Sequence, residues 1–205
     1  MIKLKIHMKN IHERQDFFFK KAKKEGYPAR SVYKLQEIDN KYRLLRSGNF
    51  VLDLGCAPGS WLMYIAERIG PMGKVWGVDL QGIRIGLSSN AKFIEKDIND
   101  LTSDDFNNVN FNLIVSDMAP NTTGIKSRDT DMSLQLVLTA FEIVKQHLKP
   151  KGHFLFKIFE SKEAHDFMKD LRKYFEIVKR HDANASRNAS KEFYVVCKNY
   201  LGTKS

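Results

Sequence analysis

A lysine stands in the middle of an apolar segment near the end of the sequence. Lys157 has only apolar neighbours in Phe154-Leu155-Phe156-Lys157-Ile158-Phe159, and lysine is rarely buried without a partner. Its ammonium could reach water at a strand end. Asp117 ends a second apolar segment, however, and adjacent parallel strands would bring the two side chains together, while Glu192 offers a further carboxylate. A buried, paired lysine of this kind is a candidate for proton transfer.

A glycine-containing segment joins a predicted strand to a predicted helix. It reads Asp53-Leu54-Gly55-Cys56-Ala57-Pro58-Gly59-Ser60-Trp61, and doubly wound sheets bind ligands at such junctions. Glycine at positions 55 and 59 lets the backbone turn tightly and approach a ligand closely. Asp79 ends the next strand, twenty residues after Gly59, where a carboxylate can accept hydrogen bonds from both hydroxyls of a ribose. These features fit NAD or S-adenosylmethionine.

Two details of this segment favour S-adenosylmethionine. The pattern is not GxGxxG, and Pro58 lacks a backbone N–H that a pyrophosphate would use. Asp53 is placed to meet a cationic group such as an amino group or a sulfonium. Asp97, after the third strand, could accept from an adenine amino group or simply cap a helix. The residues expected to bind this cofactor are Asp53, Gly55, Ala57, Pro58, Gly59, Ser60, Trp61, Asp79, Asp97 and Asp117.

Helices and strands must alternate to place these residues together. The hydrophobic pattern predicts strands over 50–54, 74–79, 91–95, 111–117, 154–159, 176–180 and 193–198, and helices over 12–25, 31–48, 60–69, 131–148 and 161–174. Such alternation predicts an α/β fold: a doubly wound, mainly parallel seven-stranded sheet with helices on both faces. The last strand should be antiparallel, because no helix precedes it. We expect Ser31 to cap the second helix and Gly48 to end it, and Pro150 and Gly152 to stop the helix over 131–148.

The excess positive charge lies at the two ends of the sequence. Residues 1–30 carry nine Lys and Arg against three Asp and Glu, residues 179–205 carry six against two, and the middle is neutral. Solvated tails are one interpretation, but segregated basic charge favours a phosphate-binding surface. We therefore expect a basic N-terminal extension over 1–30 and one domain over 31–205. Phe17, Phe18 and Phe19 in the extension could stack on bases, although at least two should pack on the domain.

The composition excludes several classes of protein. The 205 residues, 42% of them hydrophobic, suit one compact domain, and no apolar run approaches the ~18 residues of a transmembrane helix. The first residues lack the apolar stretch of a secretory signal. Cys56 and Cys197 form no CxxC pair, and the six histidines show no ligand spacing, so we expect no metal site. We expect a monomer with no membrane partner, cytoplasmic or mitochondrial and not secreted.

Four of these segments together resemble a known family. They are Ser31-Val32-Tyr33-Lys34-Leu35, Ser116-Asp117-Met118-Ala119-Pro120-Asn121, Phe156-Lys157 and Ser190-Lys191-Glu192-Phe193-Tyr194. In order and context they resemble the Lys-Asp-Lys-Glu tetrad of the FtsJ/RrmJ-type RNA ribose 2′-O-methyltransferases, over about residues 12–199. The form of the second segment, and Ala183-Asn184-Ala185-Ser186-Arg187, resemble the bacterial and mitochondrial large-subunit rRNA branch. The match departs at Cys56 and Ser60, which replace alanine and glycine, and in the spacing of residues 81–91.

The resemblance implies a class I methyltransferase that uses S-adenosylmethionine to methylate a ribose 2′-hydroxyl of RNA, a uridine of large-subunit rRNA. Lys34, Asp117, Lys157 and Glu192 are then the catalytic residues. We expect Lys157 to take the hydroxyl proton in its neutral form, Asp117 to orient it, and Lys34 and Glu192 to position the ribose and its phosphate. The partner would be rRNA or a large ribosomal subunit particle.

Three alternatives compete with this interpretation. The same tetrad could methylate a tRNA or an mRNA cap. A ribosome-assembly factor that binds RNA without catalysis could retain the fold. An NAD-dependent dehydrogenase shares the strand–loop–helix arrangement, although the form of the glycine loop argues against it.

Overall fold

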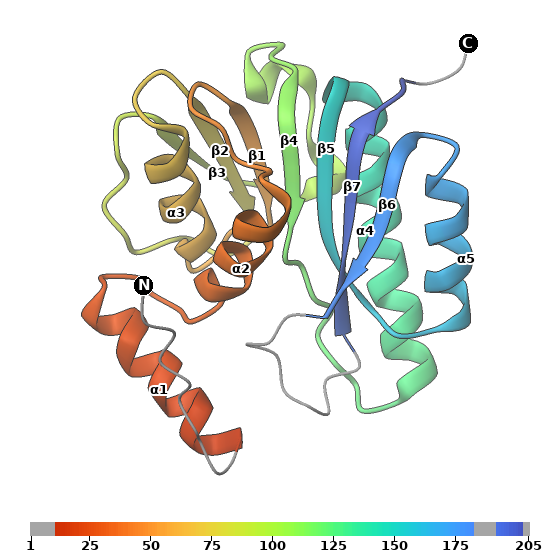
Figure 1. The fold of residues 1–205 in the computed structure, drawn as a ribbon, viewed down its shortest axis with the longest axis horizontal. Coiled ribbons are helices and arrows are strands. Elements are labelled where there is room, and N and C mark those ends of the chain that lie inside the picture. The colour runs from red at the N-terminus through yellow and green to blue at the C-terminus, as the bar shows by residue number, and fades with distance from the viewer. Residues whose placement is uncertain (1–10, 183–191, 203–205) are drawn as a thin grey trace.

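The computed structural model of the chain describes residues 11–182 and 192–202, with side chains from residue 16 onward. Within these residues seven strands form one sheet, in the order β3-β2-β1-β4-β5-β7-β6 (Figure 1). The strands are β1 (Phe50–Leu54), β2 (Lys74–Asp79), β3 (Ala91–Glu95), β4 (Phe111–Ser116), β5 (Leu148–Phe159), β6 (Phe175–His181) and β7 (Glu192–Tyr200). β1 to β5 pair in parallel, whereas β7 is antiparallel to both of its neighbours. The predicted mainly parallel sheet with an antiparallel last strand is confirmed.

Helices cover both faces of the sheet, also as predicted. They are α1 (Ile11–Lys24), α2 (Val32–Tyr42), α3 (Ser60–Ile69), α4 (Lys126–His147) and α5 (Lys162–Leu171), with short 3-10 helices η1 (Ile98–Asp100) and η2 (Ser103–Phe106). α2 and α3 share one buried apolar cluster with one face of the sheet, and α4 and α5 share a second with the other. The strand order reverses between β1 and β4. Ligands bind where the strands end at such a reversal, and we call the end of the sheet at which β1, β4 and β5 finish the carboxyl edge.

The helix predicted over 131–148 begins earlier than expected, and so does the strand that follows it. α4 starts at Lys126, because Asp129 folds the preceding loop back by accepting from the backbone N–H and hydroxyl of Thr123. It ends at His147, and β5 follows at once. Pro150 and Gly152 therefore lie inside β5, at a bulge where the register with β4 shifts. The prediction that β5 starts at residue 154 was wrong because a bulge tolerates both residue types.

α2 is shorter than its sequence pattern indicates. Ser31 occupies the N-cap position, but its side chain makes no capping hydrogen bond. The helix ends at Tyr42, well before Gly48, and Arg43 adopts the left-handed conformation with φ 55°. Both predictions for the ends of this helix were therefore wrong: the cap that Ser31 was to provide and the stop at Gly48.

Asp39 explains where α2 ends. This buried carboxylate accepts from the backbone N–H of Leu45 (2.9 Å), from the Tyr64 hydroxyl (3.2 Å) and from the Arg68 guanidinium (3.3 Å). The first contact pulls the chain back after the helix, and the other two hold α2 against α3. One polar residue on the buried face thus fixes the helix that carries Lys34.

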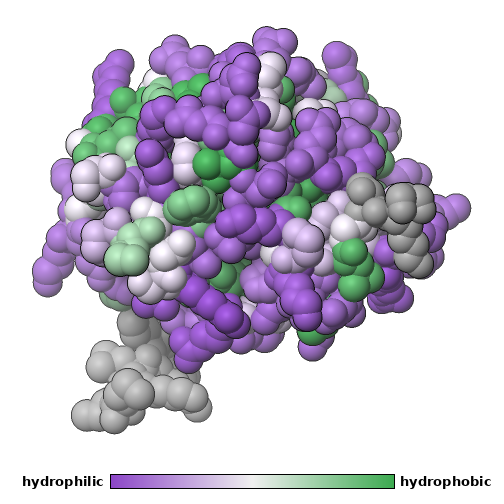
Figure 2. Space-filling model, turned by 90° about the horizontal axis from the view of Figure 1, so that it is seen from above, coloured by the Kyte–Doolittle hydropathy of each residue, from purple (hydrophilic) through white to green (hydrophobic). Residues whose placement is uncertain are grey.

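The surface at the end of the sheet opposite to the carboxyl edge is mostly hydrophilic (Figure 2). Seen from above, opposite to the carboxyl edge, hydrophilic residues cover most of the molecule and hydrophobic residues are scattered among them (Figure 2). In the part of the chain that the structure describes, none of the helices is both long enough and apolar enough to cross a bilayer.

Candidate active site

The sheet register brings Lys157 to Asp117. Ser116 of β4 pairs with Phe156 of β5, so the residues that follow each of them lie side by side at the carboxyl edge. The Lys157 ammonium is 3.0 Å from Asp117 Oδ1 and donates to the Asp117 carbonyl oxygen at 2.6 Å. Lys157 is 8% exposed. Its sequence context predicted this buried pair, and the parallel pairing of β4 and β5 produces it.

A second ion pair joins Lys34 to Glu192. Lys34 lies in the first turn of α2, and Glu192 is the first residue of β7, opposite Phe159 at the end of β5. The Lys34 ammonium is 2.7 Å from Glu192 Oε1, and both side chains are largely shielded from solvent. The structure therefore brings all four predicted catalytic residues to the carboxyl edge, as two ion pairs.

Tyr194, which was not among the predicted site residues, connects the two ion pairs. Its hydroxyl donates to Asp117 Oδ1 at 2.6 Å, the oxygen that also faces Lys157. Its ring lies 5.6 Å from the Lys34 ammonium. Burial, reinforced by the Asp117 charge, raises the pKa of Tyr194 well above its ordinary value, so the hydroxyl keeps its proton. The spacing of Glu192 and Tyr194 could have indicated this role, because residues two apart on a strand point to the same face of the sheet.

Asp53 is a buried carboxylate without a partner among the described residues. It lies in β1, has no exposed surface, and neither carboxylate oxygen makes a hydrogen bond there. Burial, with the nearby charges of Asp117 and Asp79, raises its pKa well above the ordinary value. Such a group is costly unless something pairs with it. It therefore fits a ligand that brings a cation or a hydrogen-bond donor to this point.

At two positions of the loop after β1, neighbouring side chains occupy the space that a Cβ would need. Gly55 has φ 76°, and a Cβ there would lie 2.4 Å from the Cγ of Met118. Gly59 has φ 106°, and its Cβ would lie 2.3 Å from the Cδ1 of Ile85. Side chains from the segments after β4 and after β2 therefore press on this loop. Glycine is required at both positions for conformation as well as for space.

Asp79 is oriented by two backbone groups at the end of β2. Oδ2 accepts from the Ala57 N–H at 2.9 Å, and Oδ1 accepts from the Gln81 N–H at 2.8 Å. Each carboxylate oxygen can accept a further hydrogen bond, so the ribose contacts predicted for Asp79 remain open to it. Asp97 has the capping role instead, since its Oδ1 accepts from the backbone and side-chain amides of Asn99 at the start of η1. Its adenine contact stays a prediction.

Ser60 and Trp61 use their side chains to hold the segment before α2. The Ser60 hydroxyl accepts from the Ala29 N–H at 2.7 Å, and the Trp61 indole donates to the Ser31 carbonyl at 2.9 Å. Cofactor contacts from these two residues would therefore come from their backbone at the start of α3. Pro58 lies between Ala57 and Gly59 in the same loop, so the predicted glycine-loop residues share one site.

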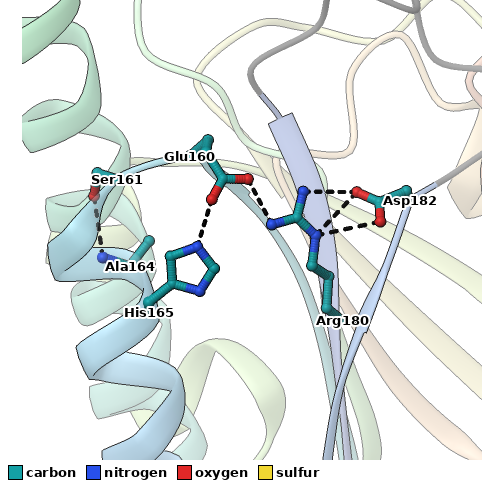
Figure 3. A network of polar contacts seen from close by, with 6 residues as sticks. All are labelled: Glu160, Ser161, Ala164, His165, Arg180 and Asp182. Carbon is teal, nitrogen blue, oxygen red and sulfur yellow. Dashed lines mark hydrogen bonds and ion pairs between the residues drawn. The ribbon is translucent and has the colours of Figure 1, made fainter.

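A polar network supports the start of β7 from the opposite face of the sheet (Figure 3). Glu160 contacts His165 and lies 2.5 Å from the Arg180 guanidinium, which also pairs with Asp182 at 2.9 Å. Arg180 lies 4.1 Å from the ring centroid of Phe193, and the His165 ring stacks on Phe193. Phe193 stands between Glu192 and Tyr194, so this clamp fixes the strand that carries both.

Comparison with known proteins settles the family. Residues 27–200 match the model of the FtsJ-like methyltransferase family. The chain belongs to that family. A relative from Lawsonia intracellularis, named ribosomal RNA large subunit methyltransferase E, is 46% identical over 187 residues, covering 89% of this chain and 93% of the relative. A protein of the same name from Syntrophobacter fumaroxidans is 43% identical, covering 89% and 94%.

Solved structures agree with the fold. A crystal structure from Plasmodium falciparum, described as a ribosomal RNA methyltransferase, has a TM-score of 0.75 at 29% identity and covers 86% of this chain and 100% of that one. The fibrillarin of Aeropyrum pernix shares the fold at a TM-score of 0.52 and 14% identity, covering 75% and 68%. The expected class I, Rossmann-like methyltransferase fold is confirmed. The family match excludes the dehydrogenase alternative.

Proposed function

We propose that this methyltransferase transfers the methyl group of S-adenosylmethionine to a ribose 2′-hydroxyl of large-subunit rRNA, on a uridine. The observation that carries the proposal is the pair of ion pairs Lys157–Asp117 and Lys34–Glu192, joined through Tyr194. This arrangement lies at the carboxyl edge beside Asp53, the carboxylate that a cationic ligand would satisfy. The names of the relatives and the family match support the substrate class.

The residues of the glycine loop and its neighbours would hold the cofactor. S-adenosylmethionine supplies, when bound, a methyl group activated by a sulfonium. Asp53 would face the cationic part, Asp79 would accept from the ribose hydroxyls, and Gly55 and Gly59 would give the backbone close approach. The unpartnered oxygens of Asp53 support this fit.

Lys157 would take the proton from the 2′-hydroxyl. In the neutral amine, the two N–H groups would donate to the carboxylate and the carbonyl of Asp117, and the nitrogen lone pair would be left to accept the proton of the 2′-hydroxyl. A general base of this kind contributes about 10²–10⁴-fold in rate, and holding the two reactants in line contributes much of the rest. Lys34 and Glu192 would position the ribose and its phosphate from the neighbouring helix and strand.

The RNA partner would be rRNA or an assembling large subunit particle. The basic excess at the two ends of the sequence supports phosphate binding. Arg187 and Lys191 belong to that excess and lie outside the described residues. We propose that the enzyme acts as a monomer and that its catalytic domain spans residues 31–205. We also propose that it acts where ribosomes assemble, in the cytoplasm or in a mitochondrion.

A substrate panel tests the proposal. Purified protein is given tritiated S-adenosylmethionine with large-subunit rRNA, large subunit particles, tRNA or capped mRNA, and the modified nucleoside is identified. The proposal predicts 2′-O-methyluridine in the first two and none in the others. Methylation confined to tRNA or to the mRNA cap would show that this RNA, and not large-subunit rRNA, is the substrate. Cofactor binding without methyl transfer to any RNA would indicate an assembly factor.

A further inference from the structure

α1 lies on the same side of the molecule as the tetrad. In Figure 1 the helix is below the sheet, past the edge at which β4 and β5 end, and it is joined to α2 by a short connection. The family model matches from residue 27 onward, so α1 lies outside the residues that define the family match.

Contacts with Tyr33 hold α1 next to the helix of Lys34. The Phe18 and Tyr33 rings are 5.2 Å apart, and Ala22 is buried beneath them. The Lys21 ammonium lies 4.4 Å from the Tyr33 ring centroid. The Tyr33 hydroxyl donates to Glu25 at 2.9 Å, just after the helix ends. Tyr33 immediately precedes Lys34, so α1 is anchored one residue from the tetrad.

The connection between α1 and α2 is anchored to α3 as well. The Tyr27 hydroxyl donates to Glu67 at 2.8 Å, and the Ser60 and Trp61 contacts described above hold residues 29–31 against the start of α3. These bonds fix the direction in which α1 leaves the domain. The helix is therefore a positioned arm and its outward face has a defined orientation.

That outward face combines one aromatic ring with lysines. Phe19 is 60% exposed, and Lys20, Lys23 and Lys24 are exposed beside it. Lys23 is four residues from Phe19 and three from Lys20, so it neighbours both on the helix surface. The structure gives these three lysines no ion pair among the described residues, and Asp16 is the one exposed acid on this part of the helix. The face is thus cationic around an unpacked aromatic.

We propose that this face of α1 binds an unpaired RNA segment that flanks the target nucleotide, with Phe19 stacking on a base and Lys20 and Lys23 contacting phosphates. The inference rests on the proposed function for the identity of the RNA. A ring flanked by cations suits single-stranded nucleic acid, because bases stack on aromatics while lysines neutralise the backbone. An unpaired loop also presents splayed bases close to its 2′-hydroxyls.

The charge and the packing favour RNA over other occupants. A helix lying on a membrane buries a broad apolar face, whereas Phe18 and Ala22 pack on the domain, Phe17 is partly buried against Phe18, and Phe19 is the only exposed aromatic in the described part of α1. A protein partner would meet a face on which lysines surround a single aromatic ring. Lysine is depleted in protein–protein interfaces relative to the rest of the surface. Polyanion binding uses all three exposed side chains at once.

Binding of a fluorescein-labelled oligouridylate, followed by anisotropy, tests the stacking. Phe19→Ala should weaken binding about 5- to 100-fold, the range of one base–aromatic stack. Phe19→Tyr should restore binding to within about twofold, whereas Phe19→Leu, equally apolar, should not. Unchanged melting temperatures would show that the surface substitutions leave the fold intact. If Phe19→Ala bound as tightly as the unmodified protein, the proposal would be wrong.

The salt dependence of the same binding tests the lysines. Lys20→Ala with Lys23→Ala should reduce the slope of log affinity against log salt concentration by about 1.4, the value for two phosphates on a single strand. Lys169→Ala with Lys173→Ala is the matched control, since both side chains are exposed on α5 and the segment after it, and it should leave the slope unchanged. Equal slopes in all three proteins would overturn the phosphate contacts.

Methyl-transfer kinetics separate this inference from the function beneath it. The arm variants should raise KM for large-subunit rRNA and leave kcat within about twofold, since α1 contacts no reacting atom. A KM effect with ribosomal particles but not with free rRNA would point to a protein component and reject the RNA proposal. If the protein methylated no RNA but bound oligouridylate through Phe19, the proposed function would fail while this inference stood.

Discussion

At the residue scale, Asp53 departs most clearly from ordinary behaviour. Its carboxylate is buried without a partner among the described residues, and its pKa is raised well above 3.8 by burial, then by Asp117 and Asp79. A carboxyl whose pKa is raised on folding adds no free-energy cost to the folded state while it is protonated. It destabilises that state once it ionises. Its penalty is absent below the unfolded value near pH 3.8 and grows, at about 1.4 kcal/mol per pH unit, until pH passes the folded pKa.

Asp53→Asn should therefore stabilise the ligand-free protein and weaken S-adenosylmethionine binding. The gain in free energy of unfolding should be near zero at pH 4 and should increase toward pH 7, because asparagine never carries the buried charge. Urea denaturation across this pH range measures the gain, and titration calorimetry measures the binding. Asp100→Asn removes a charge from the exposed surface and is the control. A destabilised Asp53→Asn at neutral pH would show that the carboxylate is satisfied.

Tyr194→Phe should slow methyl transfer while leaving cofactor affinity unchanged. The substitution keeps the buried ring but removes the hydrogen bond to Asp117 Oδ1, so the partner of Lys157 is less well oriented. A hydrogen bond to a charged group is worth about 1.5–3 kcal/mol, which corresponds to a loss of about 10- to 100-fold in kcat. Steady-state kinetics with large-subunit rRNA would check this. An unaltered kcat would mean that the hydroxyl only fills space.

The residues of the tetrad could be predicted from the sequence, and their connection could not. Lys157 stood out because a lysine among apolar residues needs a partner, and Asp117 followed from the neighbouring strand. Tyr194 lies two residues after Glu192, but an aromatic residue in a strand is usually part of the core. Its role depends on a single hydroxyl contact across the sheet, which no spacing rule specifies.

At the element scale, β7 depends on support from the face opposite the tetrad. Arg180 lies over Phe193 and pairs with Glu160 and Asp182. Arg180→Met should lower kcat by about 2- to 10-fold, because a looser strand misplaces Glu192 and Tyr194. The cost in stability should stay near 1 kcal/mol, because Arg180 is 37% exposed and its ion pairs are screened.

Lys179→Met is the control for the clamp. Lys179 is exposed and precedes Arg180 on β6, so its side chain points to the other face of the strand. Kinetics and thermal unfolding of the two variants together distinguish positioning from general destabilisation. Equal kcat values for Arg180→Met and Lys179→Met would contradict a role of the clamp in placing β7.

Asp39 is the point at which α2 is held to α3. Asp39→Ala should lower the free energy of unfolding by about 2–4 kcal/mol, because the Leu45 N–H and the Tyr64 hydroxyl lose a buried acceptor. Arg68→Ala, which removes only a half-exposed partner, should cost less than about 1 kcal/mol. Urea denaturation gives both values. Similar costs for the two variants would show that the ion pair, and not the buried acceptors, carries the stability.

The elements themselves were predictable in kind but less so at their ends. Apolar periodicity placed every strand of the described sheet, because parallel strands buried on both faces read as apolar runs. The start of α4 could not be read, since Asp129 folds the loop before it through side-chain contacts. The end of α2 depends on Asp39 in the same way. The turn signal at Gly48 then pointed to the wrong residue, whereas Pro150 predicted the end of α4 to within one residue and gave no sign that β5 begins at Leu148.

At the scale of the whole molecule, the chain order of the sheet decides where chemistry occurs. The reversal between β1 and β4 places Asp53 opposite Val115 of the neighbouring strand, two residues before Asp117, and the parallel neighbour β5 adds Lys157. The antiparallel β7 then returns Glu192 to the same edge. The neutral middle of the sequence forms most of this scaffold, and the basic C-terminal part supplies β7. The basic beginning supplies α1, whose direction is fixed by contacts with α2 and α3 that composition alone does not predict.

The central claim is that Lys157 takes the proton from the ribose hydroxyl. The most direct test is single-turnover transfer of tritiated methyl from S-adenosylmethionine to large-subunit rRNA, comparing the unmodified protein with Lys157→Met. Cofactor affinity is measured on the same samples by calorimetry. S-adenosylmethionine should bind both proteins equally well, and the transfer rate of Lys157→Met should fall by about 10²–10⁴-fold. A Lys157→Met protein that transfers methyl groups within a few fold of the normal rate would contradict it.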